Sequence, residues 1–157
     1  VKYIKKPLLL QNKSRLTHVF IYICFTYIIT NPVKPESKFW KLVKKNTPQI
    51  QWTRLESWAS FGVPDLLGYN DSCGFFMVEL KVVHGNKIHF SPHQKLFHLT
   101  RTKRDFILVN QPSLKLVKLY ESKSIPGLLT DHRETPSLAI NDWDHIQRCL
   151  LASSSDA

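Results

Sequence analysis

The chain has 157 residues and a mass of 18.3 kDa, which suits one domain with its own hydrophobic core. With 43% hydrophobic and 22% charged residues, its composition excludes a disordered chain, a collagen-like fibre and a multidomain assembly. The net charge is +10, and +9 of it lies in residues 1–48, which contain ten Lys and Arg residues and one acidic residue, Glu36. A pI near 9.7 permits nucleic acid or an anionic membrane surface as a partner and requires neither.

The first thirty residues differ in character from the rest of the chain. Five basic residues precede an apolar run at 19–29, which is the outline of a signal peptide or an N-terminal anchor. The run is shorter than the ~20 residues of a membrane-spanning helix, and no small-residue cleavage site follows it. The chain begins at Val1 and its one methionine is Met77, so we expect residues 1–31 to be a spurious or poorly ordered extension. A strand is the second interpretation and a membrane anchor the third.

The three cysteines lie far apart in the sequence and form no CxxC pair: Cys24, Cys73 and Cys149. Their odd number and wide spacing disfavour a disulfide framework and a four-cysteine zinc site. We therefore expect free thiols and a reducing, cytoplasmic environment.

From residue 32 the hydrophobic pattern predicts a mixed α/β domain that ends near residue 151, followed by a frayed tail at 152–157. An apolar stripe at helical spacing predicts a helix over 36–45, and alternation predicts a strand over 49–56. The next expected elements are a short apolar run at 65–69, a hairpin loop at 70–74, the most apolar strand at 75–83, a helix with a capping box that starts at Ser91, strands at 105–110 and 114–120, and a last helix at 141–151.

Two charged residues interrupt the most apolar strand. Glu79 and Lys81 are two residues apart, so their side chains lie on the same face. If residues 66–69 pair with 75–78 in a hairpin, Asp65 lies close to Glu79. Two carboxylates in an apolar sheet repel each other unless a cation lies between them. Oxygen ligands suit Mg²⁺ or Mn²⁺, and a neighbouring lysine can position or deprotonate a water. These are the groups that metal-dependent phosphodiester hydrolysis needs.

These residues and their neighbours resemble the PD-(D/E)XK nuclease signature. The match is to the phage-encoded and VRR-NUC branch of that superfamily, which includes Holliday-junction-resolvase-like enzymes. The resemblance implies a restriction-endonuclease-like core, with a central mixed sheet of about four or five strands flanked by helices. It spans about residues 36–120 and rests on four segments: Arg54–Glu56, Gly62–Asp65, Phe76–Lys81 and Ser91–Gln94.

The resemblance also implies roles for individual side chains. Asp65 and Glu79 would bind the metal, Lys81 would act on the attacking water, and Gln94 would support the site or contact the phosphate. The expected cofactor is Mg²⁺, with Mn²⁺ as a possible substitute. The full set of implied metal ligands is Asp65, Glu79, Leu80 and Glu36.

The activity that the resemblance implies is that of a Mg²⁺-dependent endodeoxyribonuclease in a bacterial or phage-infected cytoplasm. Its partner would be DNA and not a membrane, branched DNA is a possible substrate, and a homodimer is expected only by analogy. The stretch at 101–104 lacks the glycine turn usual in the family and is basic instead, which suits a phosphate clamp. The residues expected to contact DNA are Arg54, Arg101, Lys103 and Arg104.

Each of these residues also has a plainer interpretation. Asp65 follows Pro64 as a turn residue would, and Glu79 and Lys81 could form an ion pair on a half-exposed strand. Gln94 completes a capping box with Ser91. Considered together, within a strand too apolar for an exposed face, the residues favour the nuclease.

Three alternatives differ from an active nuclease. One is a catalytically inactive nuclease-fold module that binds DNA, and another is a protein attached to a membrane through residues 1–30. The third is a zinc site at a group of histidines without HExxH spacing, for which phosphate contacts or a surface location are the favoured interpretation. The sequence leaves open the preferred DNA structure, the choice between endo- and exonucleolytic action, and the role of residues 121–157. The histidines are His84, His89, His93 and His98.

Overall fold

The computed structural model describes residues 35–55, 62–101 and 103–152. The extension expected at 1–31, the boundary at residue 32, Cys24 and residues 153–157 of the expected tail lie outside the described residues. Cys73 and Cys149 are free thiols. Within the described part of the chain, no helix combines the length and the apolar character needed to cross a membrane.

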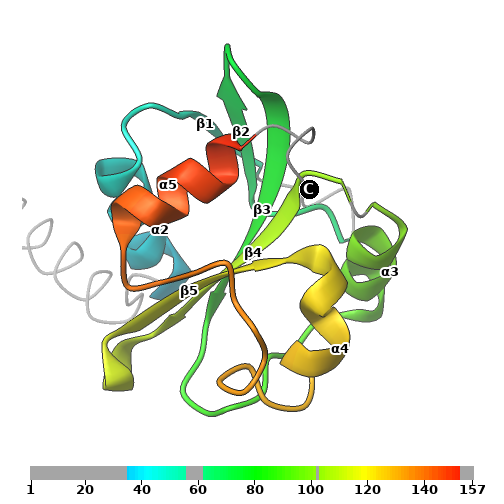
Figure 1. The fold of residues 1–157 in the computed structure, drawn as a ribbon. Helices are drawn as coiled ribbons and strands as arrows, with labels where there is room; N and C mark the ends of the chain where they lie inside the picture. The colour runs from blue at the N-terminus through cyan, green and yellow to red at the C-terminus, as the bar shows by residue number, and fades with distance from the viewer. Residues whose placement is uncertain (1–34, 56–61, 102, 153–157) are drawn as a thin grey trace, which may run out of the picture. The chain divides into compact units, whose positions relative to one another are not determined.

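Six strands form one sheet whose spatial order follows the order of the chain (Figure 1). Each adjacent pair is antiparallel except the central pair, β3 and β4, which is parallel. The predicted mixed α/β class is confirmed, although the sheet has one strand more than the four or five expected. The strands are β1 (Gln51–Arg54), β2 (Leu66–Asn70), β3 (Gly74–Val82), β4 (Asp105–Gln111), β5 (Leu116–Glu121) and β6 (Ala139–Ile140).

Helices cover both faces of this sheet (Figure 1). On one face lie α2 (Pro35–Asn46) and α5 (Trp143–Leu151), and on the other lie α3 (Pro92–Thr100) and α4 (Ile125–Leu128). Short 3-10 turns, η1 (Pro112–Leu114) and η2 (Ser122–Ser124), flank β5. The predicted helices at 36–45 and 141–151 correspond to α2 and α5, whereas α4 was not predicted because four residues are too few to show a helical period.

Side chains of the central strands alternate between two hydrophobic clusters. In β4, Phe106 and Leu108 pack toward α2 and α5, while Ile107 and Val109 pack toward α4. Because successive side chains of a strand point to opposite faces, a strand buried on both sides is apolar throughout. This explains the nearly continuous apolar run of β3, and it makes a charged residue buried in that strand an exception that needs a partner.

The β2–β3 hairpin has the register that the sequence predicted. Leu66 pairs with Val78 and Tyr69 with Phe75, so one further step along the register sets Asp65 opposite Glu79. Gly68 lies across from Phe76, and a Cβ atom at Gly68 would be 2.4 Å from that aromatic ring. A glycine at this position therefore lets the ring pack over β2.

Candidate active site

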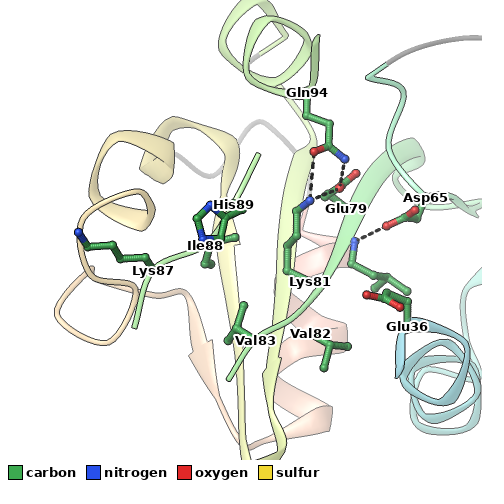
Figure 2. A pocket seen from close by; sticks show the side chains of 11 residues that line it. Glu36, Asp65, Glu79, Lys81, Val82, Val83, Lys87, Ile88, His89 and Gln94 are labelled. Carbon is green, nitrogen blue, oxygen red and sulfur yellow. Dashed lines mark hydrogen bonds and ion pairs between the residues drawn. The ribbon is translucent and has the colours of Figure 1, made fainter. Parts of the chain in front are cut away.

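A cavity of about 330 Å³ opens beside the last part of β3, and Figure 2 shows the side chains around it. Four parts of the chain line it: the start of α2, the residue before β2, β3 with the segment that follows it, and the first turn of α3. It brings together all the catalytic and metal-binding residues that the sequence indicated. Its lining residues are Glu36, Asp65, Glu79, Leu80, Lys81, Val82, Val83, Lys87, Ile88, His89 and Gln94.

Glu79 is the buried charge at the centre of the site, with only 1% of its surface exposed. Its Oε1 atom lies 2.8 Å from Lys81 Nζ and accepts a hydrogen bond of 2.5 Å from Gln94 Nε2 (Figure 2). Burial raises the pKa of Glu79, and the nearby charge of Asp65 raises it further, against the lowering effect of Lys81. The buried Oε2 atom has no hydrogen-bond partner among the described residues.

Asp65 supplies the second carboxylate, at the point where β2 begins. Its Oδ2 atom accepts a 2.9 Å hydrogen bond from the Leu80 amide, which lies beyond the last residue of β3 that pairs with β2 (Figure 2). Burial raises the pKa of Asp65, although the bond from Leu80 and the charge of Lys81 act in the opposite direction. Two adjacent carboxylates that are both costly to ionise form a site that a cation would stabilise.

Lys81 lies at the edge of the cavity with 16% of its side chain exposed. Besides its contact with Glu79, its Nζ donates to Gln94 Oε1 at 3.1 Å and lies 4.8 Å from the centre of the Phe90 ring. An ammonium group has three N–H donors, and these two oxygens account for two of them. The third is available for a water or a phosphate oxygen in the cavity.

Gln94 joins the start of α3 to the site. Its Oε1 atom accepts from the Ser91 amide at 3.0 Å as well as from Lys81, and its own backbone N–H donates to Ser91 Oγ in the reciprocal capping bond of 3.2 Å. The predicted capping box is confirmed, and the same side chain also contacts Glu79 and Lys81. Because one side chain does both, the position of the helix and that of the Glu79–Lys81 pair depend on each other.

Glu36 lies in the first turn of α2 and is exposed at the cavity, where its charge adds to the raised pKa of Asp65. Among the charged cavity residues, sequence reasoning missed Lys87, which is exposed on the segment that follows β3. Lys87 carries no motif, and only its closeness to Lys81 in the sequence could have suggested it. His89, which also lines the cavity and is exposed, was considered only as one of a group of histidines.

The basic residues expected to bind DNA have different surroundings. Arg101 and Lys103 are exposed, and the Arg101 guanidinium lies 4.5 Å from the centre of the Phe97 ring. Arg104 donates to three backbone carbonyls, those of Phe75 at 3.1 Å, Ala152 at 3.0 Å and Leu150 at 3.3 Å. Its guanidinium thus ties the end of α5 to the start of β3, which favours a structural role over phosphate binding.

Arg54 lies on β1, and its charge lowers the pKa of Asp65. It is therefore close enough to the site to influence the carboxylate pair.

The four histidines do not gather around a common point. His84, His89 and His93 are exposed, whereas His98 is fully buried and lies 2.6 Å from Asp105. Among residues 35–55, 62–101 and 103–152, no group of three or more His, Cys, Asp or Glu side chains has the arrangement to hold a metal ion. The candidate site is thus a pair of carboxylates with a third acid on the rim, not a zinc cluster.

Comparison with known proteins gives a likeness of fold but not of sequence. No family model and no curated protein sequence matches the chain. Among solved structures, the fold is similar to that of Hjc, a Holliday junction resolvase from the archaeal hyperthermophile Archaeoglobus fulgidus. The TM-score is 0.43 at 13% identity, and the likeness covers 57% of this chain and 70% of the resolvase. A TM-score of this size supports no inference about activity.

Proposed function

We propose that this protein is a nuclease that hydrolyses DNA phosphodiester bonds with the help of Mg²⁺. The observation that carries the proposal is the pair of the half-buried Asp65 and the buried Glu79, whose pKa values are both raised, next to Lys81 at a cavity. An apolar sheet tolerates two adjacent carboxylates poorly, so the arrangement has a purpose beyond stability. Sites built in this way are common where a fold binds a cation or transfers a proton.

The donor set fits a hard divalent cation. Asp65 and Glu79 offer carboxylate oxygens, and the unpartnered Oε2 of Glu79 still has its full capacity to accept. The backbone carbonyl of Leu80 is the further ligand that we propose, and Glu36 on the rim, which does not form a three-acid metal-holding group with the pair, would act on the cation through water. When bound, Mg²⁺ would supply positive charge that stabilises the negative charge of the phosphate during hydrolysis.

The residues of the chain would hold and orient the reactants. Lys81 would use its remaining donor to hold the attacking water or a phosphate oxygen, while its bonds to Glu79 and Gln94 fix the position of its amine. Gln94 would hold the side chains of Glu79 and Lys81 in a fixed relative position by forming a hydrogen bond with each. No covalent intermediate is needed, since the water attacks phosphorus directly.

DNA would contact exposed basic residues at the cavity and near the start of β3. Lys87 and His89 on the cavity rim, and Arg101 and Lys103 after α3, are exposed and able to meet backbone phosphates. Preference for branched DNA and action as a homodimer are the finer parts of this proposal. Both are tested with the panel of substrates below and by the size of the protein in solution.

The decisive experiment is cleavage of labelled DNA by the full chain in Mg²⁺ and in EDTA. Linear duplex, nicked duplex, single strands and four-way junctions are compared for the wild type, Glu79→Ala and Lys81→Ala. We expect cutting that requires the metal and is lost in both variants. A matched control is the pair of the half-buried Glu121 and the exposed Lys123, which forms an ion pair at the same spacing, so Glu121→Ala and Lys123→Ala should cut normally.

Two results would contradict the proposal. Tight DNA binding without cleavage in Mg²⁺ or Mn²⁺ would favour the inactive DNA-binding module instead. Cleavage that survives in both Glu79→Ala and Lys81→Ala would place the active site elsewhere.

A further inference from the structure

A second pair of buried polar side chains lies behind Glu79. His98, from the last turns of α3, is fully buried, and Asp105, the first residue of β4, has 3% of its surface exposed. The imidazole Nδ1 lies 2.6 Å from Asp105 Oδ2, and its ring packs edge-on against Phe90 and Phe97. Neither residue has a part in the proposed hydrolysis.

The other nitrogen of this histidine points at the catalytic carboxylate. His98 Nε2 lies 4.0 Å from Glu79 Oε2, and both atoms are buried without a hydrogen-bond partner among the described residues. Buried polar atoms are almost always paired, so two unpaired atoms facing each other are informative. Their separation is too long for a direct bond and leaves room for one bridging water, which can donate to both atoms.

Asp105 fixes which way this nitrogen points. A carboxylate is an acceptor, so Nδ1 is the atom that carries the proton toward Asp105. The bond holds the ring in one orientation, and the packing of Phe90 and Phe97 prevents it from turning away. A carboxylate that accepts from one ring nitrogen is a common way to fix the orientation of a functional histidine.

The carboxylate of Glu79 needs support on both of its oxygens. Its last torsion angle joins a tetrahedral carbon to a planar group, and such torsions have broad minima that do not define an orientation. Lys81 and Gln94 both act on Oε1, which leaves rotation about this bond limited only by what lies behind Oε2. Among the described residues, His98 is the polar group at that position.

We propose that His98, oriented by Asp105, is a positioning residue for Glu79 that holds Oε2 from behind and so presents the carboxylate to the metal. This inference rests on the proposed function, because it assigns the role to a metal ligand. The proposed active site then includes His98 from α3 and Asp105 from β4 in addition to the residues of the sequence motif.

The test compares variants that change this support with a control that only destabilises the fold. His98→Phe keeps the ring and removes both nitrogens, while Asp105→Asn keeps the volume and an acceptor and removes the charge. For each, the Mg²⁺ concentration at half-maximal cleavage, kcat, the KM for DNA and the affinity for Mn²⁺ are measured on the full chain. Thr47→Val is the control, because the buried Thr47 hydroxyl bonds Val43 and Trp52 in another part of the domain.

We expect His98→Phe to raise the half-maximal Mg²⁺ concentration by roughly ten- to a hundredfold, the usual effect of losing an outer partner of a metal ligand. Asp105→Asn should change it in the same direction by less, and the KM for DNA should stay the same in both. Thr47→Val should lose thermal stability and keep the wild-type metal dependence. His98→Gln, which restores a polar side chain able to bond a bridging water, should recover part of the Mn²⁺ affinity.

The inference is overturned if the His98 and Asp105 variants lose stability but keep the metal dependence of the wild type, as Thr47→Val does. If His98→Phe does not fold, Asp105→Asn and His98→Gln give the same decision. A wild type that binds Mn²⁺ without cutting DNA contradicts the proposed function alone, and the Mn²⁺ affinities of the variants still decide the role of His98. A wild type that neither cuts nor binds Mn²⁺ contradicts both.

Discussion

Replacing Glu79 by glutamine should make the metal-free protein more stable while abolishing cleavage. The new amide keeps an oxygen that can accept from Lys81 and Gln94. Its NH₂ group takes the place of Oε2, where it can donate to the unpaired Nε2 of His98. The variant also removes a buried negative charge that lies close to Asp65. Three unfavourable features of the native site therefore disappear together.

The expected size of the effect follows from these contacts. A buried polar atom without a partner costs about 1–3 kcal/mol, and the amide of Glu79→Gln satisfies two such atoms with one bond. Loss of the charge attraction to Lys81, which is 16% exposed, opposes this gain by about 1 kcal/mol. We expect a net gain of about 1–2 kcal/mol in the free energy of unfolding. For a domain of this size, each kcal/mol raises Tm by roughly 4 °C.

The measurement is urea unfolding of the full chain in EDTA at pH 8, followed by tryptophan fluorescence, with Glu121→Gln as the control. If Glu79 and Lys81 were a stabilising structural ion pair, removing one partner would instead destabilise the fold by about 3–5 kcal/mol. The sign of the change thus decides between a site strained for function and a simple ion pair. A loss of stability in Glu79→Gln would refute the reasoning. Added Mg²⁺ should stabilise the wild type and have no effect on Glu79→Gln.

Three further predictions concern pH, the basic residues and the hairpin. The pKa values of Asp65 and Glu79 are raised above their ordinary values of 3.8 and 4.5, so the folded state binds these protons more tightly than the unfolded state. The contribution of the two protons to stability is complete below those ordinary values and is lost as pH rises through the raised pKa values. In EDTA, the difference in free energy of unfolding between the wild type and the Asp65→Asn/Glu79→Gln double variant should therefore grow over that pH range. A constant difference would contradict the prediction. In a binding titration, Arg101→Ala should weaken DNA binding and reduce its salt dependence by about one phosphate contact. Arg104→Ala should instead lower the free energy of unfolding by about 1–3 kcal/mol, and with it Tm, and leave the salt dependence of binding unchanged. Gly68→Ala should lose about 1–3 kcal/mol in a urea titration, since its Cβ would overlap the ring across the hairpin, and a neutral result would show that the ring can move aside.

The sequence carried enough information for the site wherever its residues are close along the chain. The hairpin around residues 70–74 is short, so the register that sets Asp65 opposite Glu79 follows from the alternation of its two strands. The capping box of Ser91 and Gln94 is likewise a local pattern, and it appears in the structure as predicted. Local spacing was sufficient to predict which of these residues line one cavity.

Contacts between distant parts of the chain were beyond such reasoning. Arg104 belongs to a basic stretch that resembles a phosphate clamp, and only the packing of α5, more than forty residues later, provides the carbonyls that it binds. His98 was grouped with nearby histidines in the sequence, whereas burial of α3 on the sheet separates it from them and pairs it with Asp105. The strand β6 has two residues, too few for any periodic signal.

The single parallel pair in the sheet has a consequence for how the protein folds. Antiparallel neighbours such as β2 and β3 can form from adjacent segments, but β3 and β4 can pair only after the intervening 22 residues, which contain α3, have closed a loop. Asp65 and Glu79 meet in the local hairpin, while Gln94 and His98 arrive with the loop. Closure of this crossover pairs residues that are 28 positions apart, whereas the hairpin pairs residues 4 to 12 positions apart, and we expect the crossover to limit the folding rate. The carboxylates would then come together before their supporting donors, and a cation that binds the hairpin early would accelerate the last step of folding.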